Sequence, residues 1–160
     1  MKISKAEEQS LRIMARLAGE DGQLTLADLS LMEHLPEATI AKLLGRLRRG
    51  GLVVALRGRN GGYSLVRPAS DISAADVIRA LGRPVLEGSG CSTDSPNDPE
   101  CPHVSNCGLR SVWKHLAQQV GAVLETMTLD DLCCTEEQVQ AQLTGLDDMP
   151  TRAVEGSERS

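Results

Sequence analysis

The sequence predicts a mainly helical protein with one small β-hairpin, arranged as a winged helix-turn-helix followed by a long helix. Three observations support this fold class. Apolar residues recur at helical spacing in three successive segments before Gly50. Two short strand-like runs follow, joined by Asn60-Gly61-Gly62. A long amphipathic segment then begins after Cys107. Three helices followed by a hairpin give the element order of a winged helix-turn-helix.

The first three helices have recognisable ends. The first is expected over about residues 5–18, a short second helix follows the N-cap candidate Thr25, and the third ends near Arg49 at two glycines. Asp28 at the N3 position is an acidic variant of the capping box, and Pro36 suits the first turn of the third helix. The residues expected to be buried are Leu11, Ile13, Met14, Leu17, Ala18, Leu26, Leu29, Met32, Ile40, Leu43, Leu44 and Leu47.

The hydrophobic period changes after the third helix. Residues 52–56 and 63–66 are expected to be strands, because the Asn-Gly-Gly between them tolerates the positive φ of a tight turn. Pro68 ends the second strand, and Ser73 with Asp76 at N3 caps a fourth helix. Its expected buried residues are Val77, Ile78 and Leu81.

Four regions are expected along the chain: a winged helix-turn-helix at 1–82, a cysteine-rich loop at 83–107, a long and a short terminal helix at 108–134, and a disordered polar tail at 135–160. Thr128 caps the short helix, expected over residues 129–133. The apolar stripe of the long helix is too extensive for the small domain to cover, so we expect it to form a homodimer interface. The stripe comprises Leu109, Val112, Trp113, Leu116, Val120, Val123, Leu124 and Met127.

Charge is distributed unevenly along the chain. The net charge is −5, but the segment from Ala38 to Ser70 has seven basic and no acidic residues, so it carries +7 and the rest carries −12. Local potential attracts phosphate more than net charge does, so this segment indicates double-stranded DNA as a partner. A merely solvated surface is the alternative. The basic residues are Lys42, Arg46, Arg48, Arg49, Arg57, Arg59 and Arg67.

The predicted fold gives these residues roles. The third helix of a winged helix-turn-helix enters the major groove, and the wing reaches the backbone or the minor groove. The outward face of that helix is suited to base edges or phosphates, its basic end to the backbone, and the wing arginines to a narrow minor groove. The DNA-binding candidates are Glu37, Thr39, Lys42, Arg46, Arg49, Arg57 and Arg59.

The five cysteines point to metal or redox chemistry. With no apolar run long enough to span a membrane and no signal peptide, we expect a cytoplasmic protein with reduced thiols and no membrane partner. Cys91, Cys101 and Cys107 lie in a Gly/Pro-rich loop and could bind an iron–sulfur cluster or zinc. Cys133 and Cys134 are expected to pack as small hydrophobic residues. No catalytic motif is visible, so an enzyme is not expected.

The stretch from Leu47 to Leu81 resembles the central signature of the Rrf-type family of bacterial winged-helix transcription regulators, which includes IscR, NsrR and RirA. The matching parts are the helix end at 47–52, the wing from Arg57 to Tyr63 and the helix over 72–81. The resemblance extends over about residues 1–133. It implies a homodimer, crossed over through the long helix, that binds a two-fold operator as a repressor.

The resemblance also implies an iron–sulfur cluster that senses redox, iron or nitric oxide status and sets DNA affinity. Several members use three cysteines, often with five residues in each gap; here the gaps are nine and five. The histidine of IscR-like members, three residues after the last cysteine, is replaced by Arg110, which disfavours their 2Fe–2S arrangement. Glu8 matches the carboxylate that NsrR-like members supply from the partner subunit, so a 4Fe–4S cluster is favoured. Glu7 and His103 are alternative fourth ligands.

Three other functions stay open. The first is a zinc-stabilised regulator that uses Cys91, Cys101, Cys107 and His103, and the second is a cluster-free thiol sensor. The third is a protein–protein adaptor with the same fold. Colour separates iron from zinc, and salt-dependent DNA binding separates a regulator from an adaptor.

Overall fold

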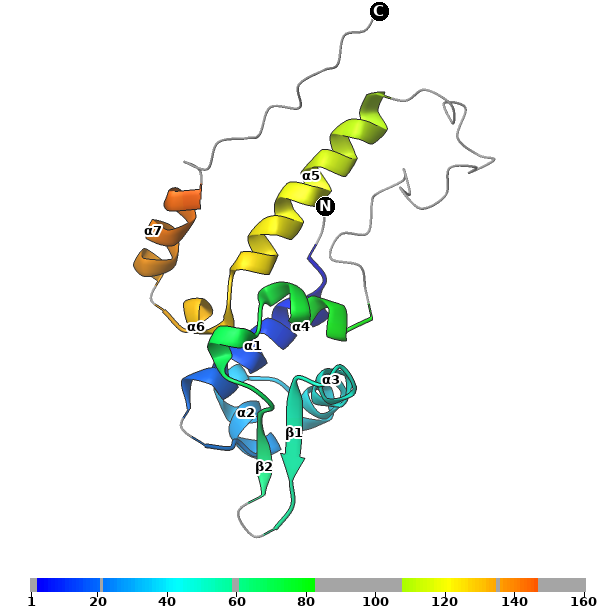
Figure 1. Ribbon diagram of the computed structural model, residues 1–160. Coiled ribbons are helices and arrows are strands. Elements are labelled where there is room, and N and C mark those ends of the chain that lie inside the picture. The colour runs from blue at the N-terminus through cyan, green and yellow to red at the C-terminus, as the bar shows by residue number, and fades with distance from the viewer. Residues whose placement is uncertain (1–2, 21, 59–60, 83–107, 135, 147–160) are drawn as a thin grey trace, which may run out of the picture.

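The computed structural model describes residues 3–20, 22–58, 61–82, 108–134 and 136–146 (Figure 1). Within them, the helices and the two-stranded hairpin confirm the predicted fold class. The elements are α1 (Lys5–Gly19), α2 (Leu26–Glu33), α3 (Glu37–Arg49), β1 (Val53–Leu56), β2 (Gly62–Leu65), the 3₁₀ turn η1 (Ala69–Asp71), α4 (Ala74–Ala80), α5 (Gly108–Thr126), α6 (Leu129–Leu132) and α7 (Glu136–Leu146). None of the described helices is long and apolar enough to cross a membrane.

Local sequence signals begin four of the helices. Thr25, Ser73 and Thr128 are the N-caps of α2, α4 and α6, as predicted, and each forms a capping box with an aspartate three residues later. Ser4 and Glu7 form a fourth capping box at α1, which the sequence analysis did not anticipate. Each box satisfies backbone N–H groups that have no partner within the helix.

The turn between α2 and α3 is set by three residues. His34 ends α2 in the left-handed conformation, with φ of 53°, and the Ser30 hydroxyl donates to the Leu35 carbonyl at 2.6 Å. Pro36 then stands at the N-cap of α3, one position before the helix rather than inside its first turn as expected. Its missing N–H costs nothing there, because helix-terminal donors have no partner within the helix.

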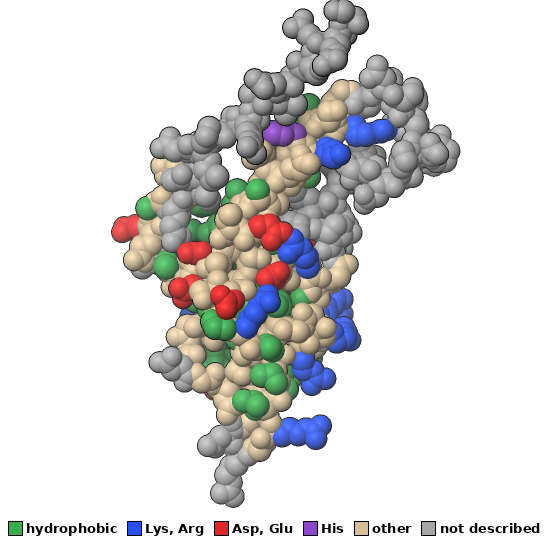
Figure 2. All heavy atoms as spheres, viewed as in Figure 1, with side chains coloured by type: hydrophobic (Ala, Val, Ile, Leu, Met, Phe, Trp, Pro, Cys, Tyr) green, Lys and Arg blue, Asp and Glu red, His purple; other side chains and the backbone are tan. Residues whose placement is uncertain are grey.

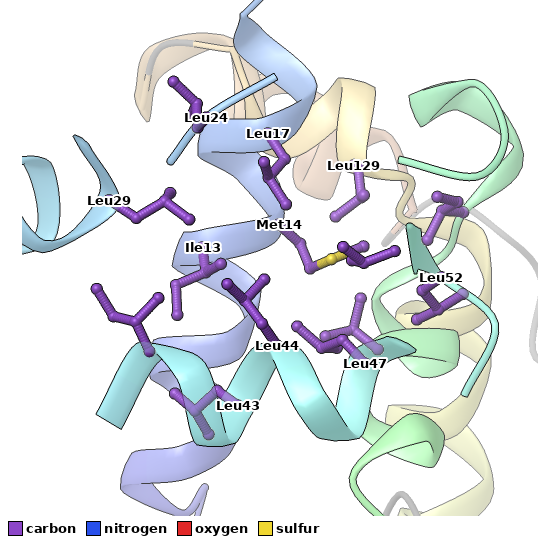
Figure 3. Close-up of a cluster of buried hydrophobic side chains, with 14 residues drawn as sticks. Ile13, Met14, Leu17, Leu24, Leu29, Leu43, Leu44, Leu47, Leu52 and Leu129 are labelled. Carbon is purple, nitrogen blue, oxygen red and sulfur yellow. The ribbon is translucent and has the colours of Figure 1, made fainter. Parts of the chain in front are cut away.

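The core is aliphatic and lies between α1 and α3 (Figure 3). Ile13 and Met14 of α1 and Leu44 of α3 have no exposed surface. Leu29 from α2 and Leu129 from α6 complete the same cluster, so the C-terminal segment is part of the core of the helix-turn-helix unit. All four residues predicted to be buried in α3 are buried, whereas Leu11, Ala18, Leu26 and Met32 are only half-buried.

The hairpin is tied to the helices by a third short segment. In β1 and β2, Val53 pairs with Leu65 and Leu56 pairs with Gly62. Leu24, between α1 and α2, exchanges two backbone hydrogen bonds of 3.0 and 2.8 Å with Tyr63. A Cβ at Gly62 would lie 2.8 Å from the Leu24 carbonyl oxygen, so this close approach requires glycine.

The long helix α5 projects from the body of the molecule on the side away from the hairpin, with its C-terminal end next to α4 and α6 (Figure 1). None of its residues is buried.

The tail differs from the prediction, because residues 136–146 form α7 instead of a disordered segment. Glu136 and Glu137 in its first turn complement the helix dipole, and Gln, Ala and Leu are good helix formers.

Candidate nucleic-acid interface and metal site

One face of α3 is buried and the opposite face is basic and exposed. The four buried residues of α3 recur at a spacing of three or four, which leaves Ala38, Lys42 and Arg49 on the outward side. Glu37, Lys42 and Arg49 are exposed, whereas Thr39 and Arg46 are half-buried. In Figure 2, Lys and Arg side chains gather along the edge of the molecule formed by α3 and β1.

The outward face of α3 also contains a gap in its side chains. Gly45 lies on this face, and a Cβ added there would meet no atom within 4 Å among the described residues, the backbone of α3 itself aside. With Ala38 and Ala41 nearby, the helix backbone is accessible to a large partner between the basic side chains. This feature is not among the predictions from the sequence, although the helical spacing of Ala38, Ala41 and Gly45 around Lys42 is a signal for it.

Most of the basic residues of the 38–70 segment form no ion pair within the part of the chain that the structure describes. Lys42, Arg46, Arg48, Arg49 and Arg57 form no salt bridge with a carboxylate of the described residues. These five cations therefore keep their charge available for phosphate groups. Arg57 is exposed at the end of β1, where the wing loop begins, and Arg59 lies outside the described residues.

Arg67 is the exception among the basic residues. Its Nη2 lies 2.7 Å from Oδ2 of Asp76 in α4, so it joins an internal ion pair. Asp76 also caps α4, accepting from the Ser73 N–H at 3.3 Å. Charge counting along the sequence could not separate Arg67 from the others, because its partner comes from the next helix.

A buried carboxylate fixes α2 against α1. Only 2% of the Glu33 side chain is exposed, and its two oxygens accept from Nε of Arg12 and Nε of Arg16, each at 2.7 Å. Burial alone would raise the pKa of Glu33, but the hydrogen bonds and charges of Arg16 and Arg12 outweigh it and lower the pKa. Glu33 is therefore held as a carboxylate at the helix that leads into α3.

The two candidate carboxylate ligands of α1 differ in availability. Glu7 is buried, and its Oε2 accepts from the Ser4 N–H at 2.6 Å in the capping box. Glu8 is exposed, with 62% of its side chain accessible, and its only ion pair among the described residues is a 3.9 Å contact with Arg12. The Glu8 carboxylate is thus free to bind a metal, whereas the Glu7 carboxylate is engaged within its own helix.

The remaining metal-ligand candidates lie outside the described residues. These are Cys91, Cys101, His103 and Cys107. Within the described part of the chain, no group of three or more His, Cys, Asp or Glu side chains could hold a metal ion. The donor set proposed from the sequence consists of soft thiolates and one carboxylate, and that set fits iron–sulfur chemistry. Glu8, the one proposed ligand that the structure describes, has an exposed carboxylate, which is compatible with such a role.

Cys133 and Cys134 differ from the expectation of burial, since both are exposed free thiols. The thiol of Cys133 nevertheless contacts α1, where it donates to the Ala15 carbonyl at 3.3 Å. Partial burial, with smaller contributions from Asp130 and Cys134, raises the pKa of the Cys133 thiol. A neutral thiol with this hydrogen bond is suited to packing α6 against α1 and is a weak nucleophile.

The apolar stripe of α5 is open to solvent in the single chain. Val112 is 53% exposed, Trp113 39% and Leu116 45%. Val120, Leu124 and Met127 are half-buried nearer the C-terminal end of the stripe. An exposed apolar stripe along a helix of this length is typical of a surface that another protein covers.

Comparison with known proteins matches residues 3–135 to the Rrf2 family model, described as an iron-dependent transcriptional regulator. Protein aau3 of Rhizobium meliloti is 30% identical over 92% of this chain and 94% of its own length. The HTH-type transcriptional regulator IscR of Yersinia pseudotuberculosis is 31% identical over 72% of this chain and 68% of its own length.

Solved structures of transcription regulators also resemble this chain. CymR, described as the global cysteine regulator of B. subtilis, aligns with a TM-score of 0.65 and 32% identity over 83% of this chain and 96% of its own. IscR of T. potens aligns with a TM-score of 0.65 and 25% identity over 94% and 93%. Members of the family are DNA-binding transcription regulators and not enzymes, and this chain belongs to the Rrf2 family.

Proposed function

We propose that this protein is a homodimeric repressor whose affinity for a two-fold operator is set by an iron–sulfur cluster. The observation that carries DNA binding is the outward face of α3, which continues to Arg57 at the wing. Lys42, Arg49 and Arg57 are exposed there without a carboxylate partner among the described residues. Helix α3 would enter the major groove, with the wing on the adjacent backbone.

The exposed stripe of α5 supports a dimer. A second copy of the chain is the partner that fits best, because family operators with two-fold symmetry require two DNA-binding units about one helical turn apart. Val112, Trp113 and Leu116 would be covered by the same residues of the partner subunit's helix. Two α3 helices could then occupy successive major grooves.

Cys91, Cys101, Cys107 and Glu8 would hold the cluster, with 4Fe–4S favoured over 2Fe–2S and with His103 as an alternative ligand. When bound, the cluster supplies a centre that oxidation, nitric oxide or iron loss can alter. Glu8 is the residue that would connect it to the helix-turn-helix unit, because its helix contributes Ile13 and Met14 to the core beneath α3. A coupling of about 1–3 kcal/mol would change DNA affinity five- to 150-fold.

The experiment is anaerobic purification followed by absorption spectroscopy and iron and sulfide analysis. We expect a brown protein with iron and sulfide, and no cluster in Cys107→Ala. Glu8→Ala should bind a labile cluster, whereas the matched control Glu20→Ala, an exposed glutamate at the other end of α1, should retain it. Colourless protein with zinc, or wild-type protein without iron and sulfide, would contradict the proposed cofactor.

A second candidate function is a cluster-free thiol sensor. The similarity to CymR favours it, since that relative is described as a cysteine regulator and its identity to this chain, 32%, exceeds that of the solved IscR structure, 25%. A metal-free protein that releases DNA on treatment with peroxide, and loses this response when Cys91, Cys101 and Cys107 are replaced by alanine, would support this alternative.

A further inference from the structure

A chain of alternating charges joins the end of the wing to the end of the long helix. Arg67, two residues after β2, lies 2.7 Å from Asp76 of α4, and Nη1 of Arg79 lies 3.3 Å from the other Asp76 oxygen. The Arg79 guanidinium also pairs with the carboxylate of Glu125, in the last turn of α5. Arg79 thus stands between one carboxylate of the helix-turn-helix unit and one of the long helix.

The backbone fixes the C-terminal end of α5 next to this ion pair. The Ala74 N–H donates to the Met127 carbonyl at 2.8 Å, and the Leu129 N–H donates to the Ile72 carbonyl at 2.9 Å. Ser73 and Thr128 therefore form an isolated antiparallel bridge between the start of α4 and the start of α6. These bonds make the junction a pivot, but they do not by themselves fix the direction of α5.

The length of α5 amplifies any change of direction at this pivot. Its 19 residues correspond to about 28 Å at about 1.5 Å per residue. A rotation of about 10° at the pivot therefore moves the far end by about 5 Å, more than the roughly 3.4 Å that separates base pairs. No residue of α5 is fully buried, and the half-buried residues Val120 and Leu124 lie toward its C-terminal end, near the pivot, so contacts among the described residues hold the far end of the helix less firmly.

We infer that Arg79 is a positioning residue that sets the half-site separation recognised by the dimer, through its ion pair with Glu125. This inference rests on the proposed homodimer, in which α5 carries the contact between protomers. The Glu125 side chain is 48% exposed, as is that of Arg79, so the pair adds little to the free energy of folding. Its effect is on the angle between α5 and the unit that bears α3.

The test measures operator spacing, which a merely stabilising pair would not alter. A high-affinity duplex is first selected from random DNA with anaerobically purified full-length protein, and its centre is then lengthened or shortened by one base pair. We expect the wild type to bind the altered duplexes at least about fivefold more weakly. Glu125→Gln and Arg79→Gln should reduce or shift this preference while leaving affinity for a single half-site unchanged.

Glu137→Gln is the matched control, because Glu137 is exposed on α7 and forms no salt bridge with another described residue. It should keep the wild-type spacing preference. If Glu125→Gln and Arg79→Gln also keep the wild-type spacing preference, the inference about Arg79 is wrong, while the proposed function is unaffected. If the wild type selects only single half-sites, the proposed dimeric operator binding fails, and the inference fails with it.

Discussion

Nε of Arg12 lies 2.7 Å from Oε2 of Glu33, an ion pair between the second turn of α1 and the last residue of α2. Arg16 binds the other oxygen of the same carboxylate. Glu33 directly precedes His34, whose left-handed conformation begins the turn into α3. The two arginines therefore fix the C-terminal end of α2. The turn that starts there determines the position of α3, the candidate recognition helix.

We predict that Glu33→Gln destabilises the protein at neutral pH. A neutral amide cannot replace the charge-assisted bonds to both guanidinium groups, and the loss should be about 1–3 kcal/mol in the free energy of unfolding. Because the pKa of Glu33 is lowered in the folded state, its contribution is present above the ordinary value of 4.5 and is lost as the pH falls through the lower folded value. Urea unfolding followed by circular dichroism, at constant protein concentration, measures both effects.

Asp28→Asn is the control for this pH dependence. The pKa of Asp28 is also lowered, mainly by the hydrogen bond from the Thr25 side chain, but Asp28 is exposed and makes no tertiary ion pair with a described residue. Its substitution should have a smaller effect than Glu33→Gln. A stability difference between wild type and Glu33→Gln that stays constant down to low pH would show that the carboxylate charge is unimportant.

We predict that Gly45→Ala separates stability from DNA binding. Alanine in the interior of a helix is more stable than glycine by about 0.5–1 kcal/mol, and apart from the backbone of α3 itself the new methyl group would meet no atom of the described residues within 4 Å. The same methyl group would stand on the outward face of α3, where it hinders close approach to bases. Thermal unfolding and fluorescence anisotropy with a selected duplex should show a more stable protein that binds DNA more weakly.

Gly50→Ala serves as the control for Gly45→Ala, and the opposite effect on stability is expected. A Cβ at Gly50 would lie 2.5 Å from Cβ of Ala80, so α3 and α4 must move apart and stability should fall. Gly45→Ala with unchanged DNA affinity would show that α3 does not approach DNA closely at this position.

Local features of the fold could be predicted from the sequence, because they depend on residues close together in the chain. The caps at Thr25 and Ser73, the buried face of α3 and the antiparallel hairpin are of this kind, although the positive φ expected within residues 60–62 is found at Gly58 and not at Gly61 or Gly62. The family signature could be recognised for the same reason, since the wing and the helix after it are contiguous.

Contacts between distant segments could not be predicted in this way. Glu33 gave no sequence signal of burial, because its two partners lie 17 and 21 residues earlier in the chain. The charge of +7 for the 38–70 segment includes Arg67, but the fold pairs Arg67 with Asp76. The preference for Glu8 over Glu7 as a ligand has its physical basis in the hydrogen bond that the Ser4 N–H donates to the Glu7 carboxylate, which the sequence alone did not predict. Helix α7 was not predicted because its segment is polar, as a disordered tail would be, and helix propensity alone is a weak signal.

We predict that Leu116→Glu weakens dimerisation. Leu116 is 45% exposed in the single chain and lies within the apolar stripe of α5, where a carboxylate would be buried without a partner in the proposed dimer. A cost of about 3 kcal/mol or more corresponds to at least a hundredfold weaker association. Sedimentation velocity over a concentration series measures it. Gln118→Glu, an exposed position on the face of α5 opposite the stripe, should leave the association unchanged; equal effects of both substitutions would place the interface elsewhere.

We predict that Lys42→Ala and Arg57→Ala each weaken DNA binding and reduce its dependence on salt. Both side chains are exposed and form no salt bridge with a described carboxylate, so each can neutralise a phosphate group. Losing one phosphate contact should lower the slope of log affinity against log salt by about 1, with little discrimination among sequences. Anisotropy titrations at several salt concentrations measure the slope. Lys114→Ala removes a charge that is also exposed, but on α5, and should leave the slope unchanged. If all three variants lose the same slope, the attraction comes from overall charge and not from the face formed by α3 and the wing.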